Sequence, residues 1–469
     1  MTEKSVKCAM WLKKVNIQPG DVIGICTHNQ PDMYVPCFAS LYVGTPLFVK
    51  YNTYFVTLTR PKVLFIHESS ANMALEVVKE LGVEIKIVVF GKLPGFQSLD
   101  DILAAQDSEI IPEFRCTKLV SPEHPAVIMY TSGSTGLPKG VVHGHKFFFN
   151  YVIDFDVLND MNHGATIMLF SPLSWMSGVT QMLRGATLPE RSVIYPEFTE
   201  ESALWLKCSH IQRSVKLTVG MSLICFFLLI VGSISTHLTY RYTIYRQIRL
   251  IRDAIYCLTG STELGGTGVR QEVNFKAGSC GRVPKNITMK VVDPDTGKVL
   301  GPNQTGEACF KSPCMMTCYY GNPEATHNVV GVGWLHTGDL MQYDEEGHAF
   351  FIDRLKDMIK YRGHHVSPGM IEQVLQTHPQ VVQAAVLGIP HDVDDEHPSA
   401  FVVRVPNGDV SRANRLVTKE DLETLVSDSL PDSMRLRGGI RFLEEIPHTS
   451  SGKVSRSDLK NLAKSYAYS

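Results

Sequence analysis

Short apolar runs alternate with amphipathic stretches in the first part of the chain. The runs at 21–26, 62–66 and 85–90 are compact enough to predict buried strands. Apolar residues recur at helical spacing over 33–43 and 69–81, which predicts a helix at each place. Alternation of strand, helix and strand favours a parallel sheet with helices packed on its faces. We therefore expect a layered α/β domain at this end of the chain.

The last hundred or so residues show a different, more mixed pattern. A helix is predicted to begin at Ser367, because serine caps helix N-termini and Pro368 suits the first turn. Strands are predicted at 383–388 and 400–403, and an amphipathic helix over 418–429. These elements predict a small α+β domain at the C-terminal end.

The composition is typical of a globular chain. Of the 469 residues, 44% are hydrophobic and 20% are charged, and the formal net charge of −2 gives no support for a nucleic-acid partner. The 11 cysteines include no Cys-x-x-Cys pair and follow no signal peptide, which favours reduced thiols inside a cell. Cys309, Cys314 and Cys318 lie close in sequence, but no histidine accompanies them at ligand spacing. We therefore interpret them as packing residues and not as a metal site.

A loop of small residues follows the apolar run at 126–130, which predicts a buried strand. Six consecutive residues of this loop are Thr, Ser or Gly: Thr131, Ser132, Gly133, Ser134, Thr135 and Gly136. Backbone N–H groups and hydroxyls can approach an anion closely here, and Lys139 adds a positive charge. A Walker A loop is excluded by Pro138, and a solvated linker needs neither a buried strand nor a terminal lysine. The pattern therefore predicts a loop that wraps polyphosphate.

Residues 131–140 resemble the phosphate loop of the adenylate-forming superfamily, which contains acyl-CoA synthetases, 4-coumarate–CoA ligases and beetle luciferases. The resemblance implies an α/β fold with a large N-terminal layered α/β domain that includes a β-barrel-like part. This domain is hinged to a small C-terminal α+β domain. The expected boundaries are 1–353 for the AMP-binding domain, 354–356 for the hinge and 357–469 for the C-terminal lid.

Further residues are similar to positions that bind the nucleotide or the acid in this family. The resemblance implies that Thr262 contacts the α-phosphate through its hydroxyl and that Glu263 binds Mg²⁺. Asp339 is implied to accept both ribose hydroxyls, the alternative being an ordinary surface turn, and Arg354 to reach the same ribose. Trp175 matches the residue that closes the floor of the acyl pocket, although a buried tryptophan is equally often part of a plain core.

The resemblance also assigns roles to the hinge and the lid. Lys356 matches the pivot of the hinge, and Lys360 matches a lysine that faces the active site in the thioester-forming pose. His365 stands where 4-coumarate–CoA ligases have a glutamine. Lys453, beside Ser451-Gly452, resembles the lysine of the adenylation step. An ammonium on a flexible stem can bridge a substrate carboxylate and the α-phosphate as negative charge develops.

The resemblance fails over 207–256. The stretch at 217–234 is uncharged and close to the roughly 20 residues that span a bilayer. Three interpretations stay open: a membrane anchor, a buried helix of a rearranged core, or a stretch joined wrongly from other coding sequence. In addition, Thr259 stands where the family has an aromatic residue that stacks on adenine.

The resemblance implies an ATP-dependent acid–thiol ligase. It would use ATP and Mg²⁺ to convert a small carboxylic acid, fatty or aryl-propenoic, into an acyl-adenylate, and CoA to form the thioester. One alternative is a luciferase-like oxygenase that shares the adenylation step. Another is a non-catalytic relative with a degenerate nucleotide site, membrane-associated through 217–234. We expect an intracellular location. The family also admits a peroxisomal one, although the C-terminus lacks a Ser-Lys-Leu type signal.

Overall fold

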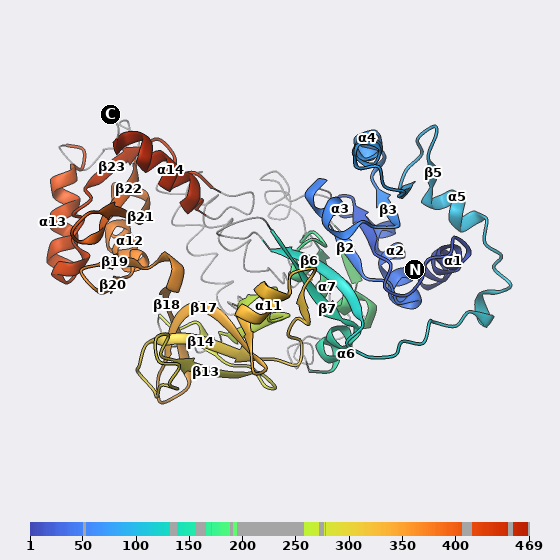
Figure 1. Cartoon of the computed structure of the whole chain (residues 1–469), viewed down its shortest axis with the longest axis horizontal. Helices are drawn as coiled ribbons and strands as arrows, with labels where there is room; N and C mark the ends of the chain where they lie inside the picture. The colour runs from blue at the N-terminus through green and yellow to red at the C-terminus, as the bar shows by residue number, and fades with distance from the viewer. Residues whose placement is uncertain are drawn as a thin grey trace.

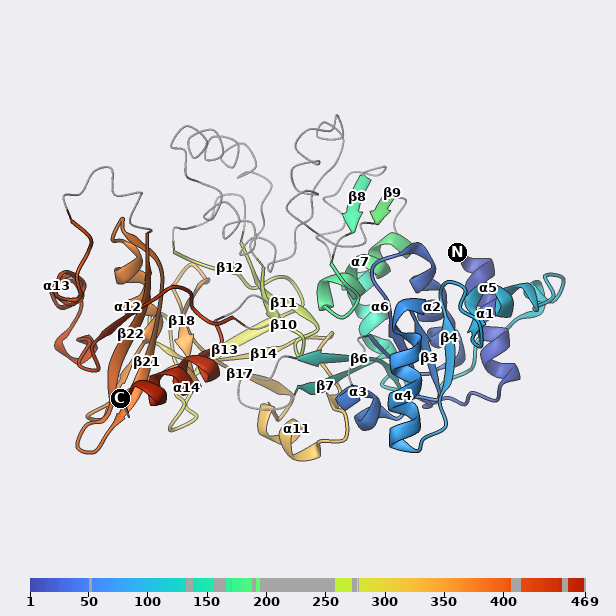
Figure 2. The same cartoon turned by 90° about the horizontal axis from the view of Figure 1, so that it is seen from above.

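The chain is organised as three large sheets with their helices. The computed structural model describes residues 1–49, 53–131, 138–154, 166–169, 171–187, 191–194, 258–271, 276, 278–405, 415–448 and 454–467. Both views place the second sheet between the other two (Figure 1, Figure 2). The segment at 207–256, with its apolar stretch at 217–234, lies outside the described residues. No helix within the described ranges is long and apolar enough to cross a membrane.

The first sheet has the strand order β15-β7-β6-β2-β1-β3-β4-β5. Its strands are β1 (Ile23–Cys26), β2 (Leu47–Val49), β3 (Val63–Ile66), β4 (Lys86–Val89), β5 (Gln97–Ser98), β6 (Pro125–Thr131), β7 (Lys139–Gly144) and β15 (Cys318–Tyr319). Its helices are α1 (Thr2–Lys14), α2 (Tyr34–Val43), α3 (Thr53–Thr59), α4 (Ala71–Leu81), α5 (Leu99–Ala104), α6 (His145–Asp154) and α7 (Met176–Thr187). Strands β1 to β6 pair in parallel, whereas β7 and β15 pair antiparallel.

The sequence pattern predicted much of this sheet correctly. The strands predicted from the three apolar runs are β1, β3 and β4, and the two predicted helices are α2 and α4. Burial on both faces explains why β1 and β3 are apolar throughout, whereas β4 begins with the exposed Lys86 and is buried only at Val88 and Val89. In β3, Val63 and Phe65 pack into the core beneath α1 and α2, while Leu64 and Ile66 pack into the core beneath α4. The sequence analysis did not predict α1.

The second sheet is antiparallel, with the order β10-β11-β12-β18-β17-β14-β13 and with β16 beside β17. Its elements are β10 (Leu258–Ser261), β11 (Gly266–Arg270), β12 (Gly281–Arg282), β13 (Thr288–Val292), β14 (Gly306–Lys311), β16 (Val330–Gly331), β17 (Trp334–Tyr343), β18 (His348–Arg354) and the helix α11 (Pro323–Val329). A separate parallel pair joins β8 (Thr166–Leu169) to β9 (Arg191–Ile194).

The third sheet forms the C-terminal lid. Its elements are β19 (Ile359–Tyr361), β20 (His364–Val366), α12 (Pro368–Gln376), β21 (Val381–His391), β22 (Asp395–Arg404), α13 (Lys419–Ser429), β23 (Ile440–Leu443) and α14 (Arg456–Ala467). The predicted cap is confirmed, because Ser367 Oγ accepts a hydrogen bond from Met370 N at 3.3 Å. Large layered α/β and small α+β parts confirm the expected fold class.

A short 3-10 helix, η7 (Leu355–Asp357), connects the second sheet to the lid. The buried carboxylate of Asp353, just before it, accepts hydrogen bonds from Ser367 Oγ and from Gly369 N. From the other side, Arg456 at the start of α14 lies 3.6 Å from Asp357 and 3.1 Å from Glu372 of α12. These charged contacts fix the first helix and the last helix of the lid against the connecting segment.

Gly24 of β1 lies where no larger residue fits. A Cβ at this position would lie 2.7 Å from Leu64 Cδ1 and 2.7 Å from Phe48 Cζ. Both side chains are fully buried, so neither can move into open space. We expect Gly24→Ala to lower the free energy of unfolding by about 1–3 kcal/mol through overpacking. Urea denaturation should show the loss, with Gly301→Ala as the control, because a Cβ there meets nothing within 4 Å. Equal midpoints for the two variants would contradict this packing.

Candidate active site

Strands β6 and β7 form a hairpin that carries the predicted phosphate loop. The last residue of β6, Thr131, is paired in register with the first residue of β7, Lys139. The two predicted phosphate-binding residues therefore lie side by side at the mouth of the loop. The other predicted loop residues lie outside the described part of the chain: Ser132, Gly133, Ser134, Thr135 and Gly136.

Tyr319 brings Lys139 and Glu263 together, although they come from distant parts of the sequence. The Lys139 ammonium lies 4.9 Å from the centroid of the Tyr319 ring. On the same tyrosine, the hydroxyl donates a hydrogen bond to Glu263 Oε1 at 2.9 Å. Burial and the neighbouring Glu263 carboxylate raise the pKa of Tyr319, so its hydroxyl keeps the proton that it donates. One tyrosine thus contacts a cation at its ring and an anion at its hydroxyl.

Pairing between β15 and β7 sets the position of Tyr319. Tyr319 is paired with Val141, and Tyr320 N donates to Gly140 O at 2.7 Å. Tyr319 was not predicted from the sequence, because the two paired segments are far apart in the chain and nothing local signals their contact.

A buried histidine, His143, forms a hydrogen bond to the backbone of the turn that carries Thr262 and Glu263. His143 Nε2 donates to Thr262 O at 2.8 Å, and Met316 N donates to Glu263 O at 2.8 Å. Burial lowers the pKa of His143 to about 4, so the imidazole is neutral and carries its proton on Nε2. Gly265 closes the turn at φ +79°, where a Cβ would lie 2.0 Å from Cys314 O. The turn is therefore a fixed structure with little freedom to move.

Asp339 and Arg354, the two residues expected at the ribose, lie next to one another. They are paired in register between β17 and β18, and Arg354 Nε lies 3.1 Å from Asp339 Oδ1. Both side chains remain partly exposed, at 23% for Asp339 and 44% for Arg354. The turn before Asp339 is stabilised by Glu307, whose Oε1 accepts a hydrogen bond from Gly338 N at 3.0 Å. A carboxylate and a guanidinium are thus presented together on a rigid edge.

The predicted lid and hinge residues lie on separate elements. Lys356 is within η7, while Lys360 and His365 are paired in register between β19 and β20, both exposed. The main chain of Lys360 is fixed by a hydrogen bond from its N–H to Glu396 Oε2 at 2.9 Å. The structure therefore places Lys360 beside His365, on a different sheet from Asp339 and Arg354. Lys453 lies outside the described residues.

Trp175 lies half-buried directly before α7. Its backbone N–H donates to Pro172 O at 3.0 Å, and its carbonyl accepts from Gly178 N at 3.0 Å. The turn is tight, because a Cβ at Gly178 would lie 2.2 Å from Pro172 O. The backbone of Trp175 is thereby held at the start of the helix.

Comparison with known proteins gives the same family along most of the chain. The pattern described as AMP-binding enzyme matches residues 1–220 and 236–320, and the AMP-binding enzyme C-terminal domain matches residues 370–453. The match is interrupted only at 221–235, so the family resemblance extends over 207–220 and 236–256, where it was expected to fail. Luciferin 4-monooxygenase of Photuris pensylvanica is 30% identical over 98% of this chain and 88% of its own length.

Two further proteins extend this similarity to a ligase and to a solved structure. 4-Coumarate–CoA ligase 2 of Solanum tuberosum is 29% identical over 97% of this chain and 87% of its own length. ATP-bound MatB from Rhodopseudomonas palustris shares the fold with a TM-score of 0.83 at 21% identity, covering 99% of this chain and 92% of that one. Together with the two family matches, these findings show that the chain belongs to the AMP-binding enzyme family and is an enzyme of the adenylate-forming type.

Proposed function

We propose that this enzyme is an ATP-dependent acid–thiol ligase. A carboxylic acid, fatty or aryl-propenoic, attacks the α-phosphate of ATP, so that pyrophosphate leaves and an acyl-adenylate forms. The thiol of CoA then attacks the acyl carbon, and AMP leaves as the thioester forms. The observation that carries the proposal is that Lys139 lies over the ring of Tyr319 while Glu263 accepts from its hydroxyl, because this tyrosine unites the two halves of the proposed nucleotide site.

The described residues fit the parts of Mg-ATP. Thr131 and Lys139, with the small residues that follow Thr131, are assigned to the polyphosphate. The hydroxyl of Thr262 is assigned to the α-phosphate. Glu263 offers the hard oxygen ligand that Mg²⁺ prefers. Its Oε1 accepts from Tyr319, so Oε2 is the oxygen assigned to the cation.

The ribose is assigned to the edge formed by Asp339 and Arg354. A carboxylate can accept from both ribose hydroxyls, and the adjacent guanidinium orients it. Because Gly338 is anchored to Glu307, the carboxylate is positioned before the nucleotide binds. Catalysis in this site is positioning and charge neutralisation, as in other phosphoryl chemistry. The half-buried Trp175 is assigned to the floor of the acyl pocket.

Two lysines of the lid serve the two half-reactions in this proposal. Lys453 is assigned to adenylation, and Lys360, with His365 beside it, to thioester formation. Rotation of the lid, residues 357–469, about the hinge at 354–356 exchanges one lysine for the other, with Lys356 at the pivot. An intracellular location goes with this chemistry, because ATP and CoA are intracellular cosubstrates.

Two alternatives remain in view, each with an observation in its favour. A luciferase-like oxygenase is favoured by the identity to the Photuris luciferin 4-monooxygenase, which at 30% is as high as the 29% identity to the Solanum tuberosum ligase. A degenerate relative that binds nucleotide poorly is favoured by Thr259 and by the interrupted family match at 221–235. Loss of an aromatic stack on adenine removes about 0.5–1.5 kcal/mol of binding free energy.

The proposal is tested by isotope exchange between pyrophosphate and ATP in the presence of a panel of fatty and aryl-propenoic acids. We expect exchange with at least one acid, followed by thioester formation when CoA is added. Light emission with adenylation but without a thioester would identify the oxygenase. If the protein is folded but none of the acids supports pyrophosphate exchange, the result would contradict the ligase and favour the degenerate relative.

Replacing Lys139 tests the phosphate site. We expect Lys139→Ala to weaken ATP binding by roughly 10–100-fold, because one charge-assisted hydrogen bond contributes about 1.5–3 kcal/mol. Lys146→Ala is the matched control, because Lys146 also follows the loop but pairs with Glu123 at 3.1 Å in exposed positions. Calorimetric titration with ATP measures both. The same ATP affinity in both variants would remove Lys139 from the site.

Replacing the lid lysines tests the division between the half-reactions. We expect Lys453→Ala to lose acyl-adenylate formation while it still converts supplied acyl-adenylate to thioester. Lys360→Ala should form the adenylate and fail in the second step. Single-turnover assays of each half-reaction separate these outcomes. If each variant loses both steps equally, the two lysines do not divide the work.

A further inference from the structure

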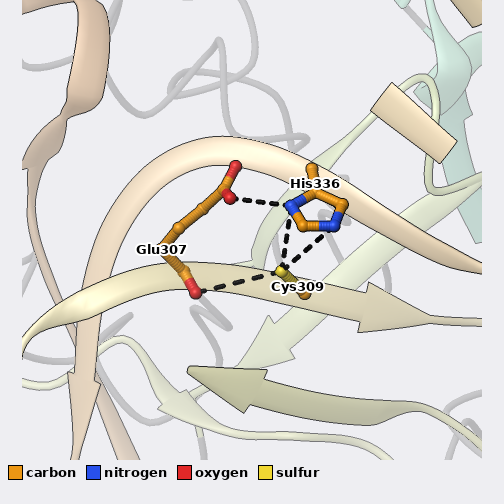
Figure 3. A group of neighbouring side chains, drawn as sticks. All are labelled: Glu307, Cys309 and His336. Carbon is orange, nitrogen blue, oxygen red and sulfur yellow. Dashed lines mark hydrogen bonds and ion pairs between the residues drawn. The ribbon is translucent and has the colours of Figure 1, made fainter. Parts of the chain in front are cut away.

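Three side chains of the second sheet meet beside the ribose-binding edge (Figure 3). Glu307 and Cys309 lie on β14, and His336 lies on the neighbouring strand β17. The ligand atoms of all three lie within 4.8 Å of one another. Cys309 had been interpreted from the sequence as a packing residue, because no histidine lies near it in the chain. Strand pairing supplies the histidine instead, since Cys309 and His336 are partners in register.

An irregularity in the strand pairing gathers these side chains. Glu307 and Cys309 are two residues apart on β14, but their partners Leu340 and His336 are four residues apart on β17. The extra length of β17 forms the turn that carries Asp339, and it leaves Glu307 and Cys309 facing His336. The cluster and the ribose-binding turn are therefore products of one bulge.

The distances suit a tetrahedral ion. His336 Nδ1 lies 3.4 Å from Cys309 Sγ and 2.7 Å from Glu307 Oε2. Zinc bonds of about 2.3 Å to sulfur and about 2.0–2.1 Å to nitrogen and oxygen put sulfur and nitrogen roughly 3.5 Å apart, and nitrogen and oxygen roughly 3.3 Å apart. The sulfur already has this spacing. The carboxylate oxygen needs to recede by about half an ångström, which rotation of the Glu307 side chain supplies.

We propose that Glu307, Cys309 and His336 bind Zn²⁺ through Oε2, Sγ and Nδ1, in a site that ties β14 to β17. The thiol proton and the proton between Glu307 and His336 leave to solvent as the three bonds to the ion form. Thiolate and imidazole select zinc over the hard cations that bind phosphates. A water completes the tetrahedron on the solvent side, because the His336 side chain is 37% exposed while Cys309 is fully buried.

Charges around the cluster are compatible with a cation. Glu307 and a Cys309 thiolate supply two negative charges. On the other side of β14, Cys309 is paired in register with Lys290 of β13. The Lys290 ammonium lies 4.5 Å from the centroid of the Trp334 ring. Glu307 Oε1 keeps its hydrogen bond from Gly338 N, because the ion takes the other oxygen. Zinc binding thus leaves the ribose-binding turn in place.

Two other donor clusters among the described residues are less suitable. In the group of His391, Asp394 and His397, the Asp394 carboxylate already pairs with Arg362 Nε at 2.6 Å. The group of Asp344, Glu346 and His348 has Lys276 Nζ on Asp344 at 2.8 Å. In both, a cation of the chain already occupies the carboxylate, and neither contains a thiol. The cluster with Cys309 can therefore be recognised by a thiolate signal.

Cobalt substitution tests the site in the full-length protein. After removal of metal with a chelator, added Co²⁺ should bind at one equivalent per chain and give a thiolate-to-metal charge-transfer absorption band. Added Zn²⁺ should then displace the Co²⁺ and remove the band. Cys309→Ser should lose the band, while Cys116→Ser, which removes an exposed free thiol, should keep it. Absence of a thiolate band in the folded wild-type protein, or an unchanged band in Cys309→Ser, would overturn the proposal.

A second variant guards against misfolding of a protein altered at a buried cysteine. His336→Gln removes a partly exposed ligand, and we expect it to weaken Zn²⁺ binding at least about tenfold. Removing a group that only orients a metal ligand already weakens binding by about that much, and loss of a ligand itself should cost no less. Zn²⁺ should also raise the thermal midpoint of the wild-type protein, because it binds only the folded state, and should raise that of His336→Gln less. Equal affinity and equal midpoint shifts in both proteins would refute the site.

Discussion

The hydrogen bond from Tyr319 to Glu263 is the contact on which the proposed nucleotide site depends. It spans 56 residues of sequence and joins the second sheet to the hairpin of the first. The Lys139 ammonium lies over the face of the Tyr319 ring and the Glu263 carboxylate lies at its hydroxyl, so each charge has its own contact on the tyrosine. In the proposed function, each of the two charges interacts with a different part of Mg-ATP.

Burial determines which groups near this contact can carry charge. His143 is fully buried, and its pKa is lowered to about 4, so it acts as a neutral donor that fixes the Thr262 carbonyl. The Tyr319 hydroxyl has a raised pKa and stays a donor to Glu263. Since neither group changes charge near neutral pH, the geometry around Glu263 does not depend on pH there. The charges that can respond to the nucleotide are those of Lys139 and Glu263.

Local pattern predicted the elements and the motif residues, but not the contacts between them. The apolar runs of β1 and β3 can be recognised in the sequence because both faces of each strand are buried, and that of β4 because Val88 and Val89 are buried. Asp339 and Arg354 were predicted from resemblance, and the register of β17 and β18 brings them together. Tyr319 was missed because its role comes from the pairing of β15 with β7. Cys309 is fully buried, as expected of a packing residue, but its neighbour His336 was not predicted for the same reason, since strand register is set by contacts between distant residues.

Glu307 connects the two chemical sites of the second sheet. One carboxylate oxygen holds Gly338, next to Asp339, the proposed ribose ligand, and the other faces His336 and Cys309. A carboxylate with two oxygens in fixed directions can serve both, because each oxygen has its own partner. This arrangement depends on the bulge in β17. If β17 lacked its extra residues, Leu340 would follow His336 more closely along the strand, and no turn would carry Asp339. The position of Asp339, the proposed ribose ligand, and the donor set beside it therefore follow from one departure from regular pairing.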